Sequence, residues 1–317
     1  MKKTLVGSFC LMFLCLCSFA AQAGHNPELG ALPVAADGGY SIFNETMVDM
    51  NWLDVEKAGQ NGAVILLSVA VIEEHGPALS IGVDTYASYL RSKLIRRELV
   101  SRGIETLIAP PMYWGINQVT SAFPGSFDIR PETVTAIIYD IFNSLKKWGF
   151  TKIFVFPSHG DRLHNSTVWK AIAAANTALG TKGYYLGSAC SARRYGLDGT
   201  ESFAVLSPCP PSSGPPPVCQ AVHAEAGETG FMAYFYPKVT DEKLSKSLDC
   251  PCITAAQLAI WRQGGDFARQ VTPLGYLGCP SDFDEHASMI STASGAIATA
   301  DLIASVLNGT YTPPPVP

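Results

Sequence analysis

The feature that most constrains the fold is a nearly continuous apolar run at residues 63–72 that ends in two glutamates and a histidine. Such a run is typical of a strand buried on both faces, and ligands of open α/β sheets bind beyond the carboxyl ends of such strands. Because side chains alternate along an extended chain, Glu73 and His75 point the same way and Glu74 the other. A converging carboxylate and imidazole make half of a metal site, although a helix cap with a solvated turn would also explain them.

Strand and helix patterns alternate after this run. Apolar residues recur at helical spacing over 84–102, and the next segments read as a strand at 104–109, a helix at 131–148, a strand at 152–157, a helix at 165–179 and a strand at 184–187. The β-α-β-α-β order predicts an α/β fold with a mostly parallel sheet and helices on both faces. Further helices are expected at 228–236 and 290–307, with an irregular stretch at 188–222 between them and the sheet.

A second alternating pair, His159 and Asp161, follows the strand predicted at 152–157. Two parallel strands that end in these pairs bring ligand-type side chains to one edge of one sheet. Three carboxylates and two imidazoles suit two divalent ions such as zinc or manganese, with one carboxylate bridging them. The sequence therefore predicts metal ligands at Glu73, His75, Asp84, His159 and Asp161.

The chain begins with two lysines, an apolar run and the small-residue pattern Ala21-Gln22-Ala23. This order is typical of a secretory signal peptide, so we expect residues 1–23 to be cleaved near Ala23. Residues 24–317 then form a single domain, since no linker or internal repeat divides them. The expected location is secreted or periplasmic.

Six cysteines follow the expected leader. An even number in an exported protein favours up to three disulfides. Cys209 and Cys219 flank a proline-rich stretch, so a local bridge between them is expected to pin an insertion at about 206–219. Cys250 and Cys252 are expected to feed two separate bridges, and a metal or redox pair is the alternative.

The net charge of −5 excludes some partners. An acidic chain without a basic stripe argues against nucleic acid and anionic membranes, and no later stretch reads as long and apolar enough for a membrane span. A neutral or cationic small molecule and divalent cations fit this charge better.

Several motifs resemble those of the creatininase (creatinine amidohydrolase) family, in the same order and over about residues 50–307. They are Glu73-Glu74-His75-Gly76-Pro77 with Gly82-Val83-Asp84, Phe123-Pro124-Gly125-Ser126, Ser158-His159-Gly160-Asp161, His223-Ala224 with Glu228-Thr229-Gly230-Phe231-Met232, and Gly275-Tyr276-Leu277-Gly278-Cys279-Pro280.

The resemblance implies a three-layer α/β sandwich with a binuclear metal site, commonly assembled as a homohexamer. It implies the same five ligands, with Asp84 as the bridging one and Asp161 where creatininase has a glutamate. His223 matches a histidine that transfers protons, which fits a general acid. Glu228 would orient His223 or support a ligand, and a carboxylate at a helix N-terminus is the competing explanation.

Departures from the family pattern argue against creatinine as the substrate. Glu74 replaces a glutamine, Gly160 a tyrosine and Cys219 a pocket tryptophan. We expect a secreted metal-dependent hydrolase that cleaves a non-peptide C–N bond of a cyclic or small linear amide through a metal-activated water. The alternative is a non-catalytic extracellular binding protein with a degenerate pocket, whereas no G-x-S-x-G motif supports a serine hydrolase.

Overall fold

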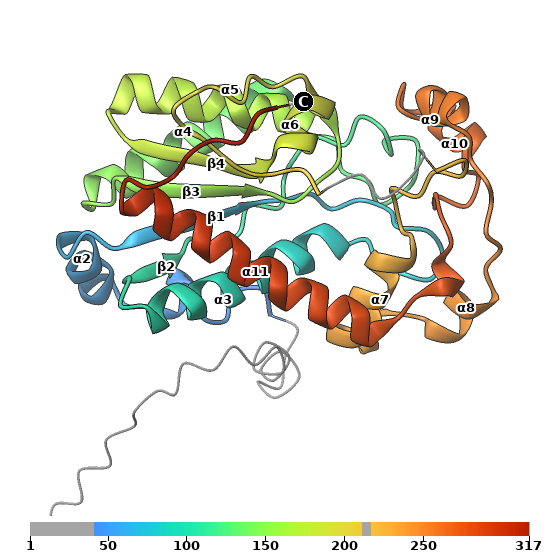
Figure 1. Ribbon diagram of the computed structural model, residues 1–317, viewed down its shortest axis with the longest axis horizontal. Coiled ribbons are helices and arrows are strands. Elements are labelled where there is room, and N and C mark those ends of the chain that lie inside the picture. The colour runs from blue at the N-terminus through green and yellow to red at the C-terminus, as the bar shows by residue number, and fades with distance from the viewer. Residues whose placement is uncertain (1–40, 211–216, 317) are drawn as a thin grey trace, which may run out of the picture.

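A five-stranded parallel sheet forms the centre of the molecule (Figure 1). The computed structural model describes residues 41–210 and 217–316. Its strands are β1 (Val64–Val69), β2 (Thr106–Ile108), β3 (Lys152–Pro157), β4 (Lys182–Ser188) and β5 (Ala204–Ser207). They lie in the order β2-β1-β3-β4-β5, and every neighbouring pair is parallel. The order reverses at β1 and β3, and the carboxyl ends of strands at such a switch point are where doubly wound sheets bind ligands.

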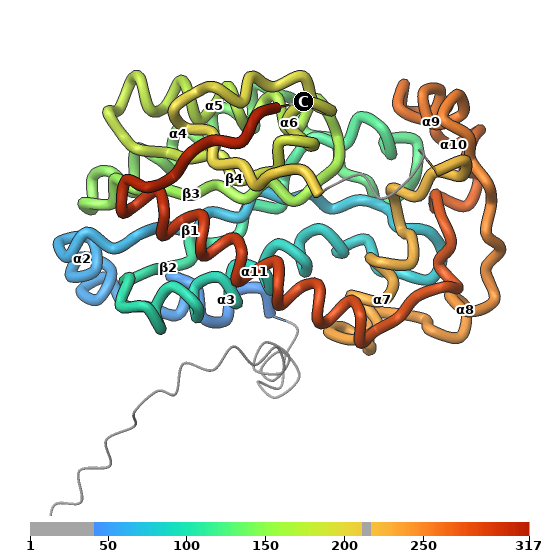
Figure 2. The backbone as a smooth tube through the Cα atoms, viewed as in Figure 1, coloured from blue at the N-terminus to red at the C-terminus, as the bar shows by residue number. Residues whose placement is uncertain are grey.

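Helices cover both faces of the sheet (Figures 1 and 2). One face carries α4 (Pro131–Lys147) and α5 (Arg162–Leu179), and the other carries α3 (Val83–Ser101), α7 (Ala226–Phe235) and α11 (Glu285–Leu307). Successive side chains of β1 alternate between the two layers, since Ile65 packs in the core with α4 and α5 and Leu66 packs with α3 and α11. The mostly parallel α/β sandwich expected from the sequence is confirmed.

The remaining helices are short. They are α2 (Trp52–Gln60), α6 (Ala189–Tyr195), α8 (Glu242–Ser247), α9 (Ala255–Trp261) and α10 (Asp266–Val271), with the 3-10 turns η2 (Met47–Asp49), η3 (Pro237–Val239) and η4 (Pro280–Asp282). Both α6 and β5 fall in the stretch 188–222 that was expected to be irregular, so that expectation was wrong. Segments of four and seven residues are too short to show a clear period.

Three disulfides join segments that follow β4: Cys190–Cys209, Cys219–Cys252 and Cys250–Cys279. The expected Cys209–Cys219 bridge was wrong, because each of these cysteines pairs outside the proline-rich loop. Cys219 meets Cys252 where Gln220 pairs antiparallel with Ile253. The prediction that Cys250 and Cys252 feed two separate bridges is confirmed. Residues 211–216 of the expected insertion and the expected leader at 1–23 lie outside the described residues.

Helix α11 has the length and composition of a membrane span, with a mean hydropathy of 1.5 over its most apolar window. The expectation that no stretch after the leader is long and apolar enough to span a membrane was therefore wrong on length and composition. In the structure the helix packs against α3 and α7, and residues such as Met289, Ala296 and Ile303 belong to the core on that face of the sheet. A core helix of a soluble protein meets the same criteria, so this feature is weak support for a membrane role.

Candidate metal centre

The ends of β1 and β3 lie side by side, because Val69 pairs with Pro157 in the parallel ladder. The chain continues from β1 to Glu73 and His75 and from β3 to His159. Asp84 comes from the first turn of α3, which begins next to the same edge. The local sequence thus delivers ligand-type side chains from three segments to the switch point of the sheet.

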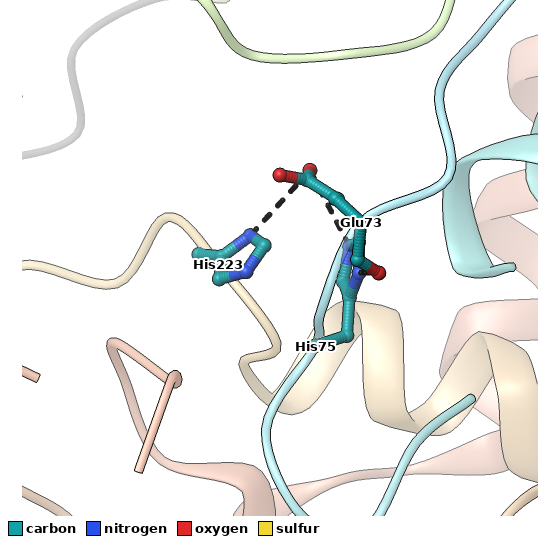
Figure 3. A group of neighbouring side chains, drawn as sticks. All are labelled: Glu73, His75 and His223. Atoms are coloured by element: carbon teal, nitrogen blue, oxygen red, sulfur yellow. Dashed lines mark hydrogen bonds and ion pairs between the residues drawn. The ribbon is translucent and has the colours of Figure 1, made fainter. Parts of the chain in front are cut away.

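Glu73 lies at the middle of the cluster. Its Oε1 is 3.0 Å from His159 Nδ1 and 4.0 Å from both His75 Nε2 and His223 Nδ1. Asp84 Oδ2 is 3.1 Å from the same His159 nitrogen. Figure 3 shows the rings of His75 and His223 approaching Glu73 from different segments of the chain. The structure therefore brings together four of the five predicted ligands and the predicted catalytic histidine.

Two groups of potential ligands share Asp84. One consists of Glu73, Asp84 and His159, and the other of His75, Asp84 and Glu228. The ligand atoms of each group lie within 4.8 Å of one another. A carboxylate common to two ligand groups is the arrangement that bridges a pair of ions. Glu73, His75 and His223 form a third group of the same kind.

Two ring nitrogens near the cluster are buried without a hydrogen-bond partner among the described residues. His75 Nδ1 lies 3.2 Å from the Glu73 carbonyl oxygen, so it must donate, and Nε2 then offers its lone pair to the cluster. Neither His75 Nε2 nor His159 Nε2 has a hydrogen-bond partner in the described part of the chain. His75 Nε2 is 3.7 Å from Glu228 Oε2, and ligands about 2.1 Å from a tetrahedral ion are separated by about 3.4 Å. These residues therefore fit a divalent ion.

The buried charges depend strongly on one another. Burial opposes ionisation of Glu73, but His159 and His223 lower the pKa of its carboxyl well below the ordinary value. Burial also raises the pKa of Asp84 to about 6. Burial disfavours a charged His159, yet Glu73 and Asp84 raise its pKa well above the usual range. Protons on imidazoles thus balance the carboxylates, and divalent ions that bind such groups displace protons.

Asp161 is placed differently from the other predicted ligands. Its Oδ1 accepts hydrogen bonds from the backbone N–H groups of Leu163 at 2.6 Å and His164 at 3.1 Å, so it caps α5. Its Oδ2 accepts from Val119 N at 3.3 Å. Asp161 lines the same cavity but belongs to none of the ligand groups found among the described residues. Its role as a ligand stays a prediction.

His223 faces the cluster through one ring nitrogen. Its Nε2 lies 2.9 Å from the backbone oxygen of Glu74 and 3.3 Å from the Glu74 carboxylate, so this nitrogen donates away from the cluster. Nδ1 is left facing Glu73. Burial disfavours the charged ring, but the carboxylates of Glu73 and Glu74 raise the pKa of His223 to about 10. Glu228 was expected to orient His223 or to support a ligand. In the structure its Oε2 lies 3.7 Å from His75 Nε2 and also accepts a hydrogen bond from Ala224 N.

Some supporting residues were not found from the sequence. Thr120 donates its hydroxyl to Glu73 Oε2 at 2.7 Å, and both residues are only 2% exposed. Ser126 accepts from the backbone N–H of Glu74, which gives the Phe-Pro-Gly-Ser turn a direct contact with the site. That turn was noted only as part of a motif. Nothing in the pattern around Thr120 indicates its role.

The cluster forms the floor of a cavity of about 520 Å³. The loop after β2 contributes Gln118, Val119 and Thr120 to its wall, and Trp261 closes another side, 5.8 Å from the ring of His223. A larger apolar cavity of about 1010 Å³ lies elsewhere, between α2 and α4, and its lining contains no group of metal ligands among the described residues. The smaller cavity is therefore the candidate active site.

The model of the creatininase family, described as creatinine amidohydrolase, matches residues 48–302. The chain belongs to the creatininase family. It is 25% identical over 221 residues to the mycofactocin precursor peptide peptidase of Mycolicibacterium smegmatis, covering 69% of this chain and 75% of that protein. A creatinine amidohydrolase (creatininase) crystal structure has a TM-score of 0.60 at 18% identity and covers 84% of this chain and 99% of that one. A structure described as "Creatininase Mn" has a TM-score of 0.57 at 18% identity, with coverages of 83% and 98%.

The family match covers all the segments that form the ligand cluster. The match includes both strand ends, the start of α3 and the His223 segment. The chain is thus a creatininase-family hydrolase of amide C–N bonds, with residues able to hold a metal at the carboxyl edge of its sheet.

Proposed function

We propose that this protein is a secreted amidohydrolase that uses two divalent ions, zinc or manganese, to cleave a C–N bond of a cyclic or small linear amide. The observation that carries the proposal is the pair of ligand groups that share Asp84 at the floor of a closed-sided cavity. The creatininase structure named "Creatininase Mn" supports manganese as one of these ions.

The side chains of this protein have separate tasks in the proposed reaction. Glu73, His75, Asp84 and His159 hold the ions, and Thr120 fixes the orientation of the Glu73 carboxylate. Ions held there would lower the pKa of a bound water towards about 7 and polarise an amide carbonyl.

His223 is the proposed proton donor to the departing nitrogen. Its Nε2 is held by the Glu74 carbonyl oxygen, so the ring cannot turn without losing that hydrogen bond. The proton that reaches the substrate must then leave from Nδ1, which faces the cluster. A neutral amine leaves more readily than an amide anion, which is the function of a general acid here.

A peptide amide is the second candidate substrate, and the name of the mycobacterial relative favours it. The non-catalytic alternative has no such support among the described residues. Secretion rests on the signal-peptide pattern and on the three disulfides, which persist in oxidising compartments. A homo-oligomer, as large as a hexamer, remains part of the proposal, as does the absence of nucleic-acid and membrane partners.

The test is metal analysis of the purified mature protein together with a hydrolysis screen of lactams, hydantoins and small linear amides with zinc or manganese. We expect bound divalent ions and turnover of at least one class, and we expect loss of both in His75→Ala and Asp84→Asn. Full activity with retained metal in either variant would refute the proposed site. Metal without turnover on any amide would favour a binding protein.

A further inference from the structure

The cavity above the ligand cluster is lined by four arginines, although the chain has a net charge of −5. They are Arg91, Arg162, Arg194 and Arg262. The carboxylates of the cavity lie at its buried floor, where they form the ligand groups or cap α5. The lining therefore contains four guanidinium groups beside four carboxylates, Glu73, Asp84, Asp161 and Glu228.

Two of these arginines have partners within the protein. Burial lowers the pKa of Arg91, and the nearby carboxylates of Glu228 and Asp84 act in the opposite direction, so this guanidinium is part of the charge balance of the floor. Arg162 donates from Nε to the backbone oxygen of Tyr195 at 3.2 Å and so holds the end of α6. Both have a structural explanation.

Arg194 and Arg262 have no such explanation. In residues 41–210 and 217–316, neither guanidinium has an ion pair or a hydrogen bond to a carboxylate. Their charges also act on each other, since the pKa of Arg262 is lowered by burial and by Arg194. Both side chains are exposed to solvent, and their N–H donors are therefore available to an anion that enters the cavity.

The two arginines are held on segments that the disulfides fix. Arg194 lies in the last turn of α6, which begins beside Cys190, and Cys190 is bonded to Cys209. Arg262 is the C-cap of α9, and the strand-like segment before α9 is bonded through Cys252 to Cys219. This anchoring fixes the backbone at both positions, so that chiefly the two side chains must become ordered when a ligand binds.

Both arginines also lie next to residues that reach the cluster. The ring of Trp261, which precedes Arg262, lies 5.8 Å from the ring of His223 at an interplanar angle of 46°. Tyr195, which follows Arg194, is buried with its phenol pKa raised, and the charges of Arg194, His159 and Asp84 all act on that phenol. Both arginines are thus sequence neighbours of residues that line the same cavity.

We propose that Arg194 and Arg262 bind a carboxylate of the substrate, so that the enzyme acts on amides that carry a free carboxylate near the scissile bond. Guanidinium groups bind carboxylates through paired N–H donors, and Arg is the residue suited to this geometry. N-acyl amino acids and the carboxyl-terminal bond of a short peptide share this chemistry. The inference rests on the proposed hydrolytic function and differs from the neutral or cationic ligand that the net charge had indicated.

The carboxylate takes no part in bond making. Water supplies oxygen to the amide carbon, the C–N bond breaks, and the products are a carboxylic acid and an amine that gains a proton. The bound carboxylate only positions the amide over the cluster, so Arg194 and Arg262 act through substrate binding.

The experiment compares matched substrates with the metal-loaded mature protein. One pair is N-acetyl-L-alanine and its carboxamide, and the other is trialanine and trialanine amide, so the two sources of carboxylate are separated. We expect kcat/KM for the free acid of at least one pair to exceed that of its amide by about tenfold to a hundredfold, chiefly through KM. In Arg194→Gln and Arg262→Gln this ratio falls towards one, and Arg194→Lys retains part of it.

Arg193→Gln is the matched control, because Arg193 is adjacent, exposed and absent from the lining of the cavity. It should keep the wild-type ratio. Metal content and thermal melting of all variants show that the fold is intact.

Hydrolysis of acid and amide at equal kcat/KM would refute the carboxylate site but would still support the proposed hydrolytic function. If none of the four compounds is hydrolysed, calorimetric titration measures whether the protein binds the acids in preference to the amides. Binding of the acids alone, lost in Arg194→Gln, then supports the carboxylate site while refuting hydrolysis of these amides. No preference for the acids in binding refutes the site.

Discussion

The hydrogen bond from Thr120 to Glu73 gives a sharp test of how the metal centre is supported. Replacing Thr120 with valine exchanges the hydroxyl for a methyl group of similar size, so the main change is loss of the 2.7 Å hydrogen bond to Glu73 Oε2. A hydrogen bond to a charged group contributes about 1.5–3 kcal/mol, and both residues are almost fully buried. The Glu73 carboxylate then lacks the side-chain donor that orients its Oε2.

We expect Thr120→Val to weaken divalent ion binding by about tenfold to a hundredfold, as for other residues that orient metal ligands. Competition with a chelating indicator measures this dissociation constant directly. Thr177→Val is the control, because that hydroxyl bonds only to the Ala173 carbonyl on an exposed helix face. Wild-type metal affinity in Thr120→Val would show that Glu73 does not ligate an ion, or that Thr120 does not orient it.

Three further changes have distinct expected results. Gly275→Ala should lower kcat with metal retained, because Gly275 has a φ of +76° and its Cβ would collide with the Glu74 carboxylate that contacts His223; normal turnover would contradict this. Glu45→Gln should make the free energy of unfolding depend less on pH at acid pH. Burial raises the pKa of Glu45, but its cationic partners on α3 lower it overall. The stabilisation by the Glu45 carboxylate is therefore full above pH 4.5 and is lost as the pH falls through the lowered pKa. Urea unfolding at several pH values measures that slope, and an unchanged slope refutes it. A Cys190→Ser and Cys209→Ser double variant should lose about 3 kcal/mol of stability in urea unfolding, since 19 positions separate the two residues; an unaltered midpoint would refute a stabilising bridge.

The sheet and the centre of the site were predictable from the sequence because both depend on short-range patterns. The run at residues 63–72 indicated a strand buried on both faces, and parallel strands place the residues after their carboxyl ends at one edge of the sheet. Glu73, His75 and His159 could therefore be grouped before their distances were known. The structure places His159 Nδ1 3.1 Å from Asp84 Oδ2.

Features that depend on tertiary contacts were not predictable in this way. Asp161 comes after β3 as a ligand would, but it is also the residue before α5 and caps that helix. Sequence alone cannot decide between two such uses of one carboxylate. Cys209 lies close to Cys219 in the chain, yet its partner is set by the packing of α6. Arg194 and Arg262 reach one cavity from segments far apart in sequence, which no local motif indicates.

The central claim is that Asp84 holds two ions in common, and metal content of the Asp84→Asn variant tests it most directly. Elemental analysis of the mature wild-type protein should find about two divalent ions per chain. The variant should lose most of both, because one side chain belongs to both ligand groups. Wild-type metal content in Asp84→Asn, or loss of one ion with the other unaffected, would contradict the account.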